Sequence, residues 1–386
     1  MKLDFININS FYKSPSFGGV GEAVPFSFLI AGGGTGGHIF PAIAIANALK
    51  KQCPNCKILF VGAKGKMEME KVPQAGYDIK GLDIAGFNRA SILKNITLPF
   101  KLIKSFFQVK NIVKDFKPNA AIGVGGYSSF PVLRYCQFKN IPTFIHESNS
   151  FAGKSNIQLG KKASQIFVAT DGMEKFFPLQ KIKITGNPIR SNIAQNSISQ
   201  NDALSFFGLN PNKKTLLIIG GSLGAKSIND AIAKNINHFA QNDIQLIWQT
   251  GKNNAADYIK HKTDGIWINA FIEKMENAYA AADVVISRAG AMSVAEICVV
   301  NKPAVFVPYP YAAEDHQTVN AQHLVQKNAA ILVKDIDASK SLANTTISLL
   351  NNQELQNSIK KQIAQLAITN ADEVIATYIL NYLNGR

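Results

Sequence analysis

The stretch Ser287-Arg-Ala-Gly-Ala-Met-Ser-Val-Ala-Glu296 comes directly after the apolar run Val284-Val-Ile286. The apolar run predicts a buried strand, and the glycine predicts a turn that leads into a helix. A helix that begins at the carboxyl end of a parallel strand points its free backbone N–H groups into a crevice, where phosphates and sugar hydroxyls bind. The stretch therefore predicts one unit of a parallel α/β sheet with a ligand site at its edge.

Glu296 gives this predicted helix a carboxylate. Two carboxylate oxygens can accept both hydroxyls of a ribose, so the segment is typical of a clamp that holds a nucleoside diphosphate without metal. A plain strand, turn and helix with Glu296 on a solvated face explains the same residues. The segment alone leaves both interpretations open.

A second glycine-rich turn, Gly32 to Gly37, lies between an apolar run at 25–31 and a helical pattern from His38 to Lys51. Its G-x-G-x-x-G spacing is typical of dinucleotide sites, which also need an acidic residue about 20 residues later to hold a ribose. At that place the chain has Lys64, which suits only a 2′-phosphate. An NADP-dependent oxidoreductase is therefore the less favoured hypothesis.

Strand and helix patterns alternate twice along the chain, which predicts an α/β protein with two doubly wound Rossmann-like domains that face a cleft. The expected segments are an N-terminal extension at 1–24, a first domain at 25–190, a polar linker with one short helix at 191–214, a second domain at 215–352, and C-terminal helices at 353–386 that could pack back on the first domain. Residues 1–24 lack the apolar core of a secretory signal, and whether they belong to the native protein stays open.

Composition limits the class of protein. No apolar run approaches the ~20 residues of a membrane span. The four cysteines are scattered, and the lone pair Cys53-Pro-Asn-Cys56 predicts a turn rather than a metal site. The formal charge of +15 indicates an anionic partner: nucleic acid, an acidic membrane surface or a phosphorylated substrate. No recognition helix or aromatic RNA-binding motif supports the nucleic acid.

A basic, apolar segment makes the anionic membrane the favoured surface partner. Between Arg89 and Lys117 there are seven Lys or Arg residues and one acid. The pattern from Leu102 onward predicts a core-facing helix, whereas the part before it suits the headgroup region of a bilayer. The membrane candidates are Ile92, Lys94, Ile96, Phe100, Lys101 and Lys104.

Six motifs occur in a fixed order. They are Gly32-Gly-Gly-Thr-Gly-Gly-His38-Ile-Phe-Pro41, Gly123-Val-Gly-Gly-Tyr-Ser-Ser-Phe-Pro131, His146-Glu-Ser-Asn149, Gly186-Asn-Pro-Ile-Arg190, Gly220-Gly-Ser222-Leu-Gly-Ala225 and Ser287 to Glu296. From about residue 26 to the C-terminus the chain resembles the MurG family, the peptidoglycan N-acetylglucosaminyltransferases that make lipid II from lipid I. Residues 1–24 depart from the family pattern.

The resemblance implies a GT-B fold, in which the second domain binds UDP-N-acetylglucosamine (UDP-GlcNAc) and the first holds the lipid acceptor, with no cofactor. The implied donor-binding residues are Thr35, Gly36, Gly37, Asn149, Arg190, Ser222, Ile272, Ala291, Met292, Ser293, Val294, Ala295, Glu296 and Gln317. The acceptor-binding candidates are Gly125, Gly126, Tyr127, His146 and Glu147. Arg190 could equally form a structural salt bridge, and Ile272 could be ordinary core.

His38 is the candidate general base, because a helix N-terminus favours the neutral imidazole that a base needs. It would deprotonate the 4-hydroxyl of the muramyl sugar, which attacks the anomeric carbon opposite UDP with inversion. A structural histidine is the alternative. Asp335-Ile-Asp337 has the D-x-D form of metal-dependent enzymes, but it precedes a predicted helix near Ala338, so a turn and N-cap explain it and no metal is expected.

The resemblance also places the protein peripherally on the cytoplasmic face of the inner membrane, with lipid I, the anionic membrane surface and other cell-wall synthesis enzymes as partners. The nearest alternatives are a glycolipid synthase with the same fold and a nucleotide-sugar epimerase.

Overall fold

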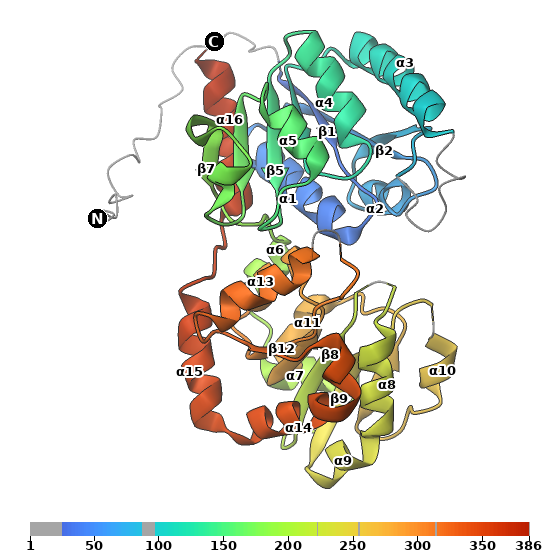
Figure 1. Cartoon of the computed structure of the whole chain (residues 1–386), viewed down its shortest axis with the longest axis vertical. Helices are drawn as coiled ribbons and strands as arrows, with labels where there is room; N and C mark the ends of the chain where they lie inside the picture. Colours follow the sequence, from blue (N-terminus) through green and yellow to red (C-terminus); the bar gives the residue numbers. More distant parts are fainter. Residues whose placement is uncertain (1–24, 87–96, 222, 254, 313–314, 386) are drawn as a thin grey trace.

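The computed structural model describes residues 25–86, 97–221, 223–253, 255–312 and 315–385. Two α/β units lie one above the other, joined by two chain crossings (Figure 1). The first holds β1 Ser27–Ala31, α1 Gly36–Gln52, β2 Lys57–Ala63, α2 Glu68–Gln74, β3 Asp78–Leu82, α3 Leu98–Phe116, β4 Ala120–Gly123, α4 Ser129–Phe138, β5 Thr143–Glu147, α5 Lys154–Gly160, β6 Gln165–Val168, the 3₁₀ turns η3 Met173–Lys175 and η4 Leu179–Lys181, and β7 Ile182–Ile184.

The second unit follows without a long connection. It holds α6 Ser191–Ala194, α7 Gln200–Phe207, β8 Lys214–Ile219, α8 Lys226–Lys234, α9 Ile236–Gln241, β9 Ile244–Gln249, α10 Ala255–Ile259, β10 Ile266–Asn269, α11 Met275–Ala281, β11 Val284–Ser287, α12 Ala291–Val299, β12 Ala304–Phe306, α13 His316–Val325, β13 Ile331–Leu332, the 3₁₀ turn η6 Asp335–Asp337, α14 Ala338–Asn351 and α15 Gln353–Ala364. The last helix, α16 Ala371–Asn384, returns to the first unit.

Both sheets are parallel and doubly wound. The strand order is β3-β2-β1-β4-β5-β6-β7 in the first and β10-β9-β8-β11-β12-β13 in the second. The order reverses between β1 and β4 in one sheet and between β8 and β11 in the other. Loops that leave neighbouring strands in opposite directions open a crevice at such a point, so each sheet offers a ligand site there.

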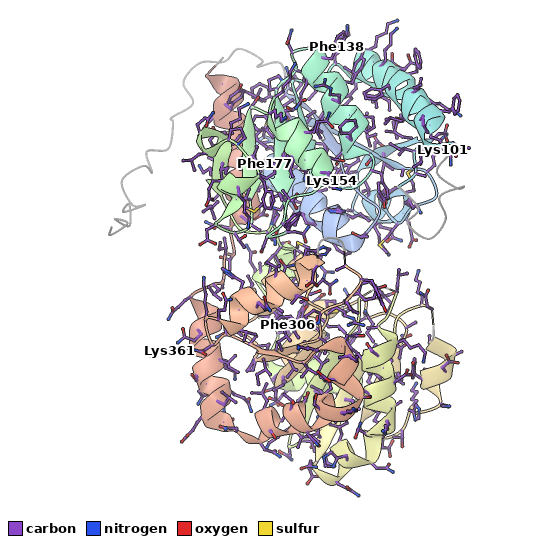
Figure 2. All side chains as sticks on the ribbon, viewed as in Figure 1. Lys101, Phe138, Lys154, Phe177, Phe306 and Lys361 are labelled. Carbon is purple, nitrogen blue, oxygen red and sulfur yellow. The ribbon has the colours of Figure 1, made fainter. Side chains whose placement is uncertain are left out.

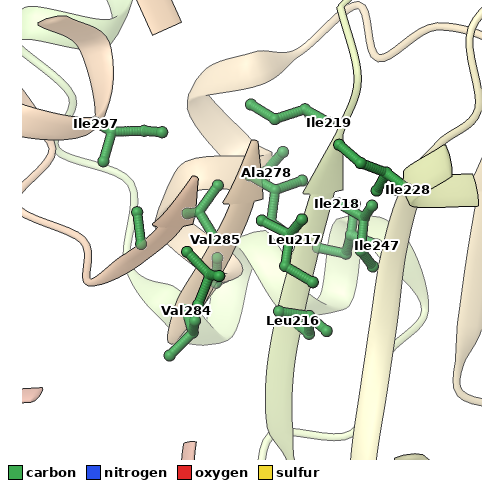
Figure 3. Packing of buried hydrophobic residues seen from close by; sticks show 14 of the residues in the cluster. Leu216, Leu217, Ile218, Ile219, Ile228, Ile247, Ala278, Val284, Val285 and Ile297 are labelled. Atoms are coloured by element: carbon green, nitrogen blue, oxygen red, sulfur yellow. The ribbon is translucent and has the colours of Figure 1, made fainter. Parts of the chain in front are cut away.

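The central strands are mostly apolar because helices cover both faces, whereas the edge strands β3 and β7 carry charged residues such as Lys80 and Lys183. In β1, Phe28 and Ile30 pack toward α1 and α16, whereas Leu29 and Ala31 pack toward α3, α4 and α5. Figure 3 shows the same arrangement in the second unit, where side chains of β8 and β11 such as Leu217 and Val285 lie side by side in its core.

The segment 191–214 differs from the expected linker with one short helix. It forms α6 and α7, and the α7 residues Ala203, Leu204 and Phe207 are buried in the core of the second unit. The Ser199 side chain accepts a hydrogen bond from the first turn of α7, and Gly208 ends the helix in a left-handed conformation. These two residues cap a helix whose short apolar face is not evident in a sequence segment rich in polar residues.

The C-terminal helix α16 packs on α1. Ile375 and Ile379 join the core of the first unit, and Tyr378 donates a hydrogen bond to Gln165 on β6 at 2.6 Å. The chain therefore crosses between the units twice, once after β7 and once before α16 (Figure 1).

Candidate active site

The glycine turns quoted from the sequence lie at the two switch points. The turn at 32–37 follows β1 and the turn at 123–127 follows β4, its neighbour in the first sheet. In the second sheet the turn after β8 adjoins the one that joins β11 to α12. Ser222, in the turn after β8, lies outside the described residues.

His38 is the third residue of α1, which begins after the N-cap Thr35. Its Nδ1 lies 3.1 Å from the carbonyl oxygen of Gly33. Because a carbonyl oxygen only accepts, Nδ1 carries the proton and Nε2 keeps a free lone pair. Burial of the His38 ring lowers its pKa, and the carboxylates of Glu147 and Glu68 only partly offset this, so the net shift is downward. The ring is therefore neutral near pH 7 and its Nε2 can accept a proton.

Three residues of the first unit that are predicted to contact the donor, Thr35, Gly36 and Gly37, lie directly before His38 in the chain. Thr35 is exposed, and Gly36 and Gly37 form the open first turn of α1. The Thr35 hydroxyl lies 3.5 Å from His38 Nδ1.

The turn after β4 packs directly against the first glycine turn. Gly126 has φ +86°, and a side chain there would overlap the carbonyl oxygen of Gly33. A side chain at Gly125 would likewise overlap the His38 ring. Tyr127 is exposed and lies against Gly86. The acceptor candidates 125–127 therefore adjoin the free side of His38.

His146 lies at the end of β5. It is fully buried, and its Nε2 donates to the carbonyl oxygen of Gly186 at 3.2 Å. Burial lowers the pKa of His146 to about 4. His146 thus links β5 to the loop after β7, and its contact with the acceptor stays a prediction.

Glu147 is also buried, and both of its carboxylate oxygens are used. Oε1 accepts from the backbone N–H and the side-chain amide of Asn149 at 3.1 and 3.3 Å. Oε2 accepts from the backbone of Gly153 and the side chain of Asn156. Glu147 therefore holds the loop that carries Asn149, and its contact with the acceptor stays a prediction.

Arg190 connects the two units. Its guanidinium lies 4.5 Å from the ring centre of Phe40 on α1, and it donates to Glu296 Oε1 on α12 at 3.0 Å. The other carboxylate oxygen of Glu296 accepts from the buried hydroxyl of Tyr279 at 3.1 Å. Glu296 is therefore not on a solvated face. Arg190 forms the salt bridge that the sequence left as an alternative.

Residues 291–296 form the first turns of α12. Ala291, Val294 and Ala295 share one face of the helix, and that face borders a cavity of about 540 Å³ between the units. Glu296 is buried and points elsewhere, toward Arg190 and Tyr279. The six predicted contacts, which include Met292 and Ser293, therefore divide between different faces of the helix.

Two further predicted contacts lie in the second unit, Ile272 in the loop after β10 and Gln317 in the first turn of α13. Ile272 is buried, and its N–H donates to Gln249 at 2.9 Å. Gln317, at the start of α13, accepts from the N–H of Tyr309 at 3.0 Å. In this structure both residues fix loop backbone, so a role in donor binding remains a prediction.

Asp335 of the D-x-D sequence pairs with Arg288, which follows β11. Arg288 also donates to the carbonyl oxygens of Val307 and Pro308 and to the hydroxyl of Ser227. Helix α14 begins at Ala338, as predicted, after a 3₁₀ turn. The carboxylate of Asp335 is thus committed to an ion pair that ties three loops together.

Three residues of this region were not predicted. Glu68 accepts from the N–H groups of Gly34 and Ala63, Tyr279 holds Glu296, and Arg288 joins the loops. Each acts across neighbouring strands or helices. None of the three has a sequence spacing that marks its partner.

The exposed face of α3 holds the described membrane candidates. Phe100, Ile103 and Phe107 are 74%, 55% and 62% exposed and lie at helical spacing. Lys101 is exposed, while Lys104 pairs with Asp83 at 2.9 Å. The apolar stripe continues beyond the expected limit at Leu102. Ile92, Lys94 and Ile96 lie outside the described residues.

Two Rossmann-like units with glycine turns at facing switch points define the GT-B class of glycosyltransferases. The first unit matches the Glycosyltransferase family 28 N-terminal domain over residues 28–168, and the second matches the family's C-terminal domain over residues 215–375. The chain belongs to this family and, within it, to the MurG enzymes.

Curated relatives and solved structures agree with that assignment. The chain is 50% identical over 353 residues to the "UDP-N-acetylglucosamine--N-acetylmuramyl-(pentapeptide) pyrophosphoryl-undecaprenol N-acetylglucosamine transferase" of Phocaeicola vulgatus, covering 90% of this chain and 94% of the relative. It is similar to the crystal structure of MurG from Acinetobacter baumannii, with 27% identity, a TM-score of 0.71 and coverage of 93% and 100%. A UDP-GlcNAc 2-epimerase from Neisseria meningitidis, 13% identical with a TM-score of 0.66 and coverage of 93% and 100%, shares the fold.

Proposed function

We propose that this protein transfers N-acetylglucosamine from UDP-GlcNAc to the 4-hydroxyl of the muramyl unit of lipid I, giving lipid II. The observation that carries the proposal is the neutral His38, with its free Nε2 beside the glycine turn at 125–126. The family supports the donor, the acceptor and the type of reaction.

His38 would act as general base. Its Nδ1–H is held by Gly33, so Nε2 faces the acceptor candidates and can take the proton of the attacking hydroxyl. The oxygen then forms a bond to the anomeric carbon of the donor, and the bond from that carbon to UDP breaks on the opposite face. The configuration inverts, and UDP leaves with its electron pair.

The second unit would hold the nucleotide. Glu296 is fixed by Arg190 and Tyr279, and each of its oxygens retains a further lone pair for a ribose hydroxyl. Nε of Arg190 is buried and has no hydrogen-bond partner among the described residues. The N-terminus of α12 would face the diphosphate and offset its negative charge.

The lipid acceptor requires a membrane-facing surface, and the exposed face of α3 is the best supported one. Phe100, Ile103 and Phe107 would enter the interface, with Lys101 beside anionic headgroups. Phe138, at the end of α4, and Lys101 lie in the part of the first unit away from the second (Figure 2). None of the helices in the described part of the chain is long and apolar enough to cross a membrane. We propose a peripheral position on the cytoplasmic face of the inner membrane, which membership of the MurG family supports.

The direct test is incubation of the purified protein with UDP-GlcNAc and lipid I in detergent. We expect lipid II with a β linkage, and UDP in equal amount. A reaction without acceptor that converts UDP-GlcNAc into its 2-epimer would instead identify an epimerase, which shares this fold.

A further inference from the structure

Glu68 fills the inside of the glycine turn that precedes His38. It is the first residue of α2 and is 1% exposed. Its Oε1 accepts from the N–H of Ala63 at 2.9 Å, and its Oε2 accepts from the N–H of Gly34 at 2.8 Å. A Cβ atom at Gly33 or Gly62 would overlap the Glu68 side chain. The turn is therefore shaped around this carboxylate.

The carboxylate takes a place that an anionic ligand takes in nucleotide-binding folds. There the N–H groups of a glycine turn bind a phosphate. Here the N–H of Gly34 is already bound to a carboxylate from the same chain. This accounts for a G-x-G-x-x-G sequence in a domain that holds the acceptor.

One peptide group connects Glu68 with His38. The N–H of Gly34, which donates to Glu68, and the carbonyl of Gly33, which accepts from His38 Nδ1, belong to the same planar unit. A hydrogen bond at one end of a peptide group polarises the other end. The carboxylate, the peptide and the imidazole thus form a single hydrogen-bonded chain.

No Lys or Arg in the described part of the chain forms an ion pair with Glu68. Burying a carboxylate is costly unless hydrogen bonds compensate for the lost water, and two backbone donors do so here. An apolar side chain of similar size would fill the space but would leave the N–H groups of Gly34 and Ala63 unpaired. The carboxylate therefore fixes the backbone of the turn at these two N–H groups, one of which belongs to the peptide group that His38 also contacts.

We propose that Glu68 is the positioning residue of His38, acting through the Gly33–Gly34 peptide group to fix the Nδ1–H tautomer and the direction of Nε2. The inference rests on the proposed function in that His38 is the base of the transfer. It assigns Glu68 no contact with donor or acceptor.

The test uses Glu68→Gln, which keeps the size and removes the charge, and Glu68→Ala, which opens a carboxylate-sized space. Glu70→Ala is the matched control, because Glu70 lies on the same helix and its side chain is 61% exposed. We expect kcat to fall about 10- to 100-fold in both Glu68 variants with the KM for UDP-GlcNAc unchanged, as for a misplaced catalytic group. Formate should restore part of the activity of Glu68→Ala, and of that variant alone.

NMR titration of the His38 ring in the free protein provides the readout that does not depend on activity. Glu147 and Glu68 raise the pKa of His38, while burial and His316 lower it, and His146 lies near enough to be affected by its charge. Removing the charge of Glu68 alone should therefore lower the pKa of His38. In a His38→Ala background, Glu68→Gln should cause no further loss of kcat.

Each result decides the proposal. Loss of kcat no greater than in Glu70→Ala, or an unmoved His38 titration, would overturn it. An additional loss from Glu68→Gln in the His38→Ala background would also overturn it, because Glu68 would then act elsewhere. A wild-type protein that makes no lipid II would reject the proposed function, while the NMR titration would still decide whether Glu68 controls His38.

Discussion

Arg190 and Glu296 form a 3.0 Å ion pair that joins the crossing between the two units to the helix that begins at the second switch point. Both side chains are mostly buried, at 22% and 9% exposure. The guanidinium also stacks on Phe40 of α1, so one side chain touches both units at the crevice. The proposed nucleotide site is thereby coupled to the helix that carries His38.

Glu296 should be the main determinant of nucleotide affinity. Glu296→Ala removes the acceptor of the ribose hydroxyls, so UDP affinity should fall by about 1.5–3 kcal/mol, as for hydrogen bonds to a charged group. Tyr279→Phe removes one hydrogen bond to that carboxylate, so UDP affinity should fall by about 0.5–1.5 kcal/mol. Calorimetric titration with UDP measures both. Unchanged affinity in Glu296→Ala would reject the clamp.

Asp335 should act on stability. Asp335→Ala leaves the guanidinium of Arg288, 11% exposed, without its carboxylate, and the free energy of unfolding should fall by about 1.5–3 kcal/mol. The exposed Asp337, two residues on, is the control, and its replacement by Ala should change stability by no more than about 0.5 kcal/mol. Urea denaturation compares the two. Equal effects would mean that the Arg288 pair is not stabilising.

His146 should make stability depend on pH. Its pKa is lowered to about 4 in the folded chain, so between the ordinary value of 6.5 and about 4 only the unfolded chain binds this proton. Stability from this group is present above pH 6.5 and is lost as the pH falls, by up to about 1.4 kcal/mol per pH unit. His146→Gln should show a shallower loss than the wild type in denaturation at pH 4.5–7. If the two slopes match, His146 is not buried in its neutral form.

Much of the fold is predictable from local patterns, because an apolar strand, a glycine turn and a helix each leave a short signature, as at 25–51 and 284–296. The position of His38 at a helix start follows in the same way. The caps of α7 were equally local, at Ser199 and Gly208, but its apolar face was too short to stand out.

The rest depends on which strands are neighbours. Glu68 reaches the glycine turn because β2 lies beside β1, and Tyr279 reaches Glu296 across two helices. Neither pairing has a sequence spacing from which it could be predicted. The burial of His146 and Glu147 was not predicted either. They are the last two residues of β5, and polar residues at a strand end are typical of an exposed site. Burial of the ring, rather than the helix end, is also the main cause of the lowered pKa of His38.

The apolar face of α3 should bind anionic membranes. Phe100→Asp with Phe107→Asp should release the protein from vesicles that contain anionic lipid and leave UDP affinity unchanged. Ile336→Asp is the control, because Ile336 is 83% exposed on the second unit. Lys101 adds on the order of 1 kcal/mol, which salt should weaken. If cosedimentation with these vesicles responds neither to the Phe100→Asp and Phe107→Asp substitutions nor to salt, the docking surface lies elsewhere.

The proposed roles of His38 as the base and of the second unit as the UDP site are separated by one comparison. It measures kcat for lipid II formation and the Kd for UDP in wild type and His38→Ala. Loss of a general base should lower kcat by roughly 10²- to 10⁴-fold, and the Kd for UDP should stay the same. A kcat equal to that of the wild type would exclude His38 as the base.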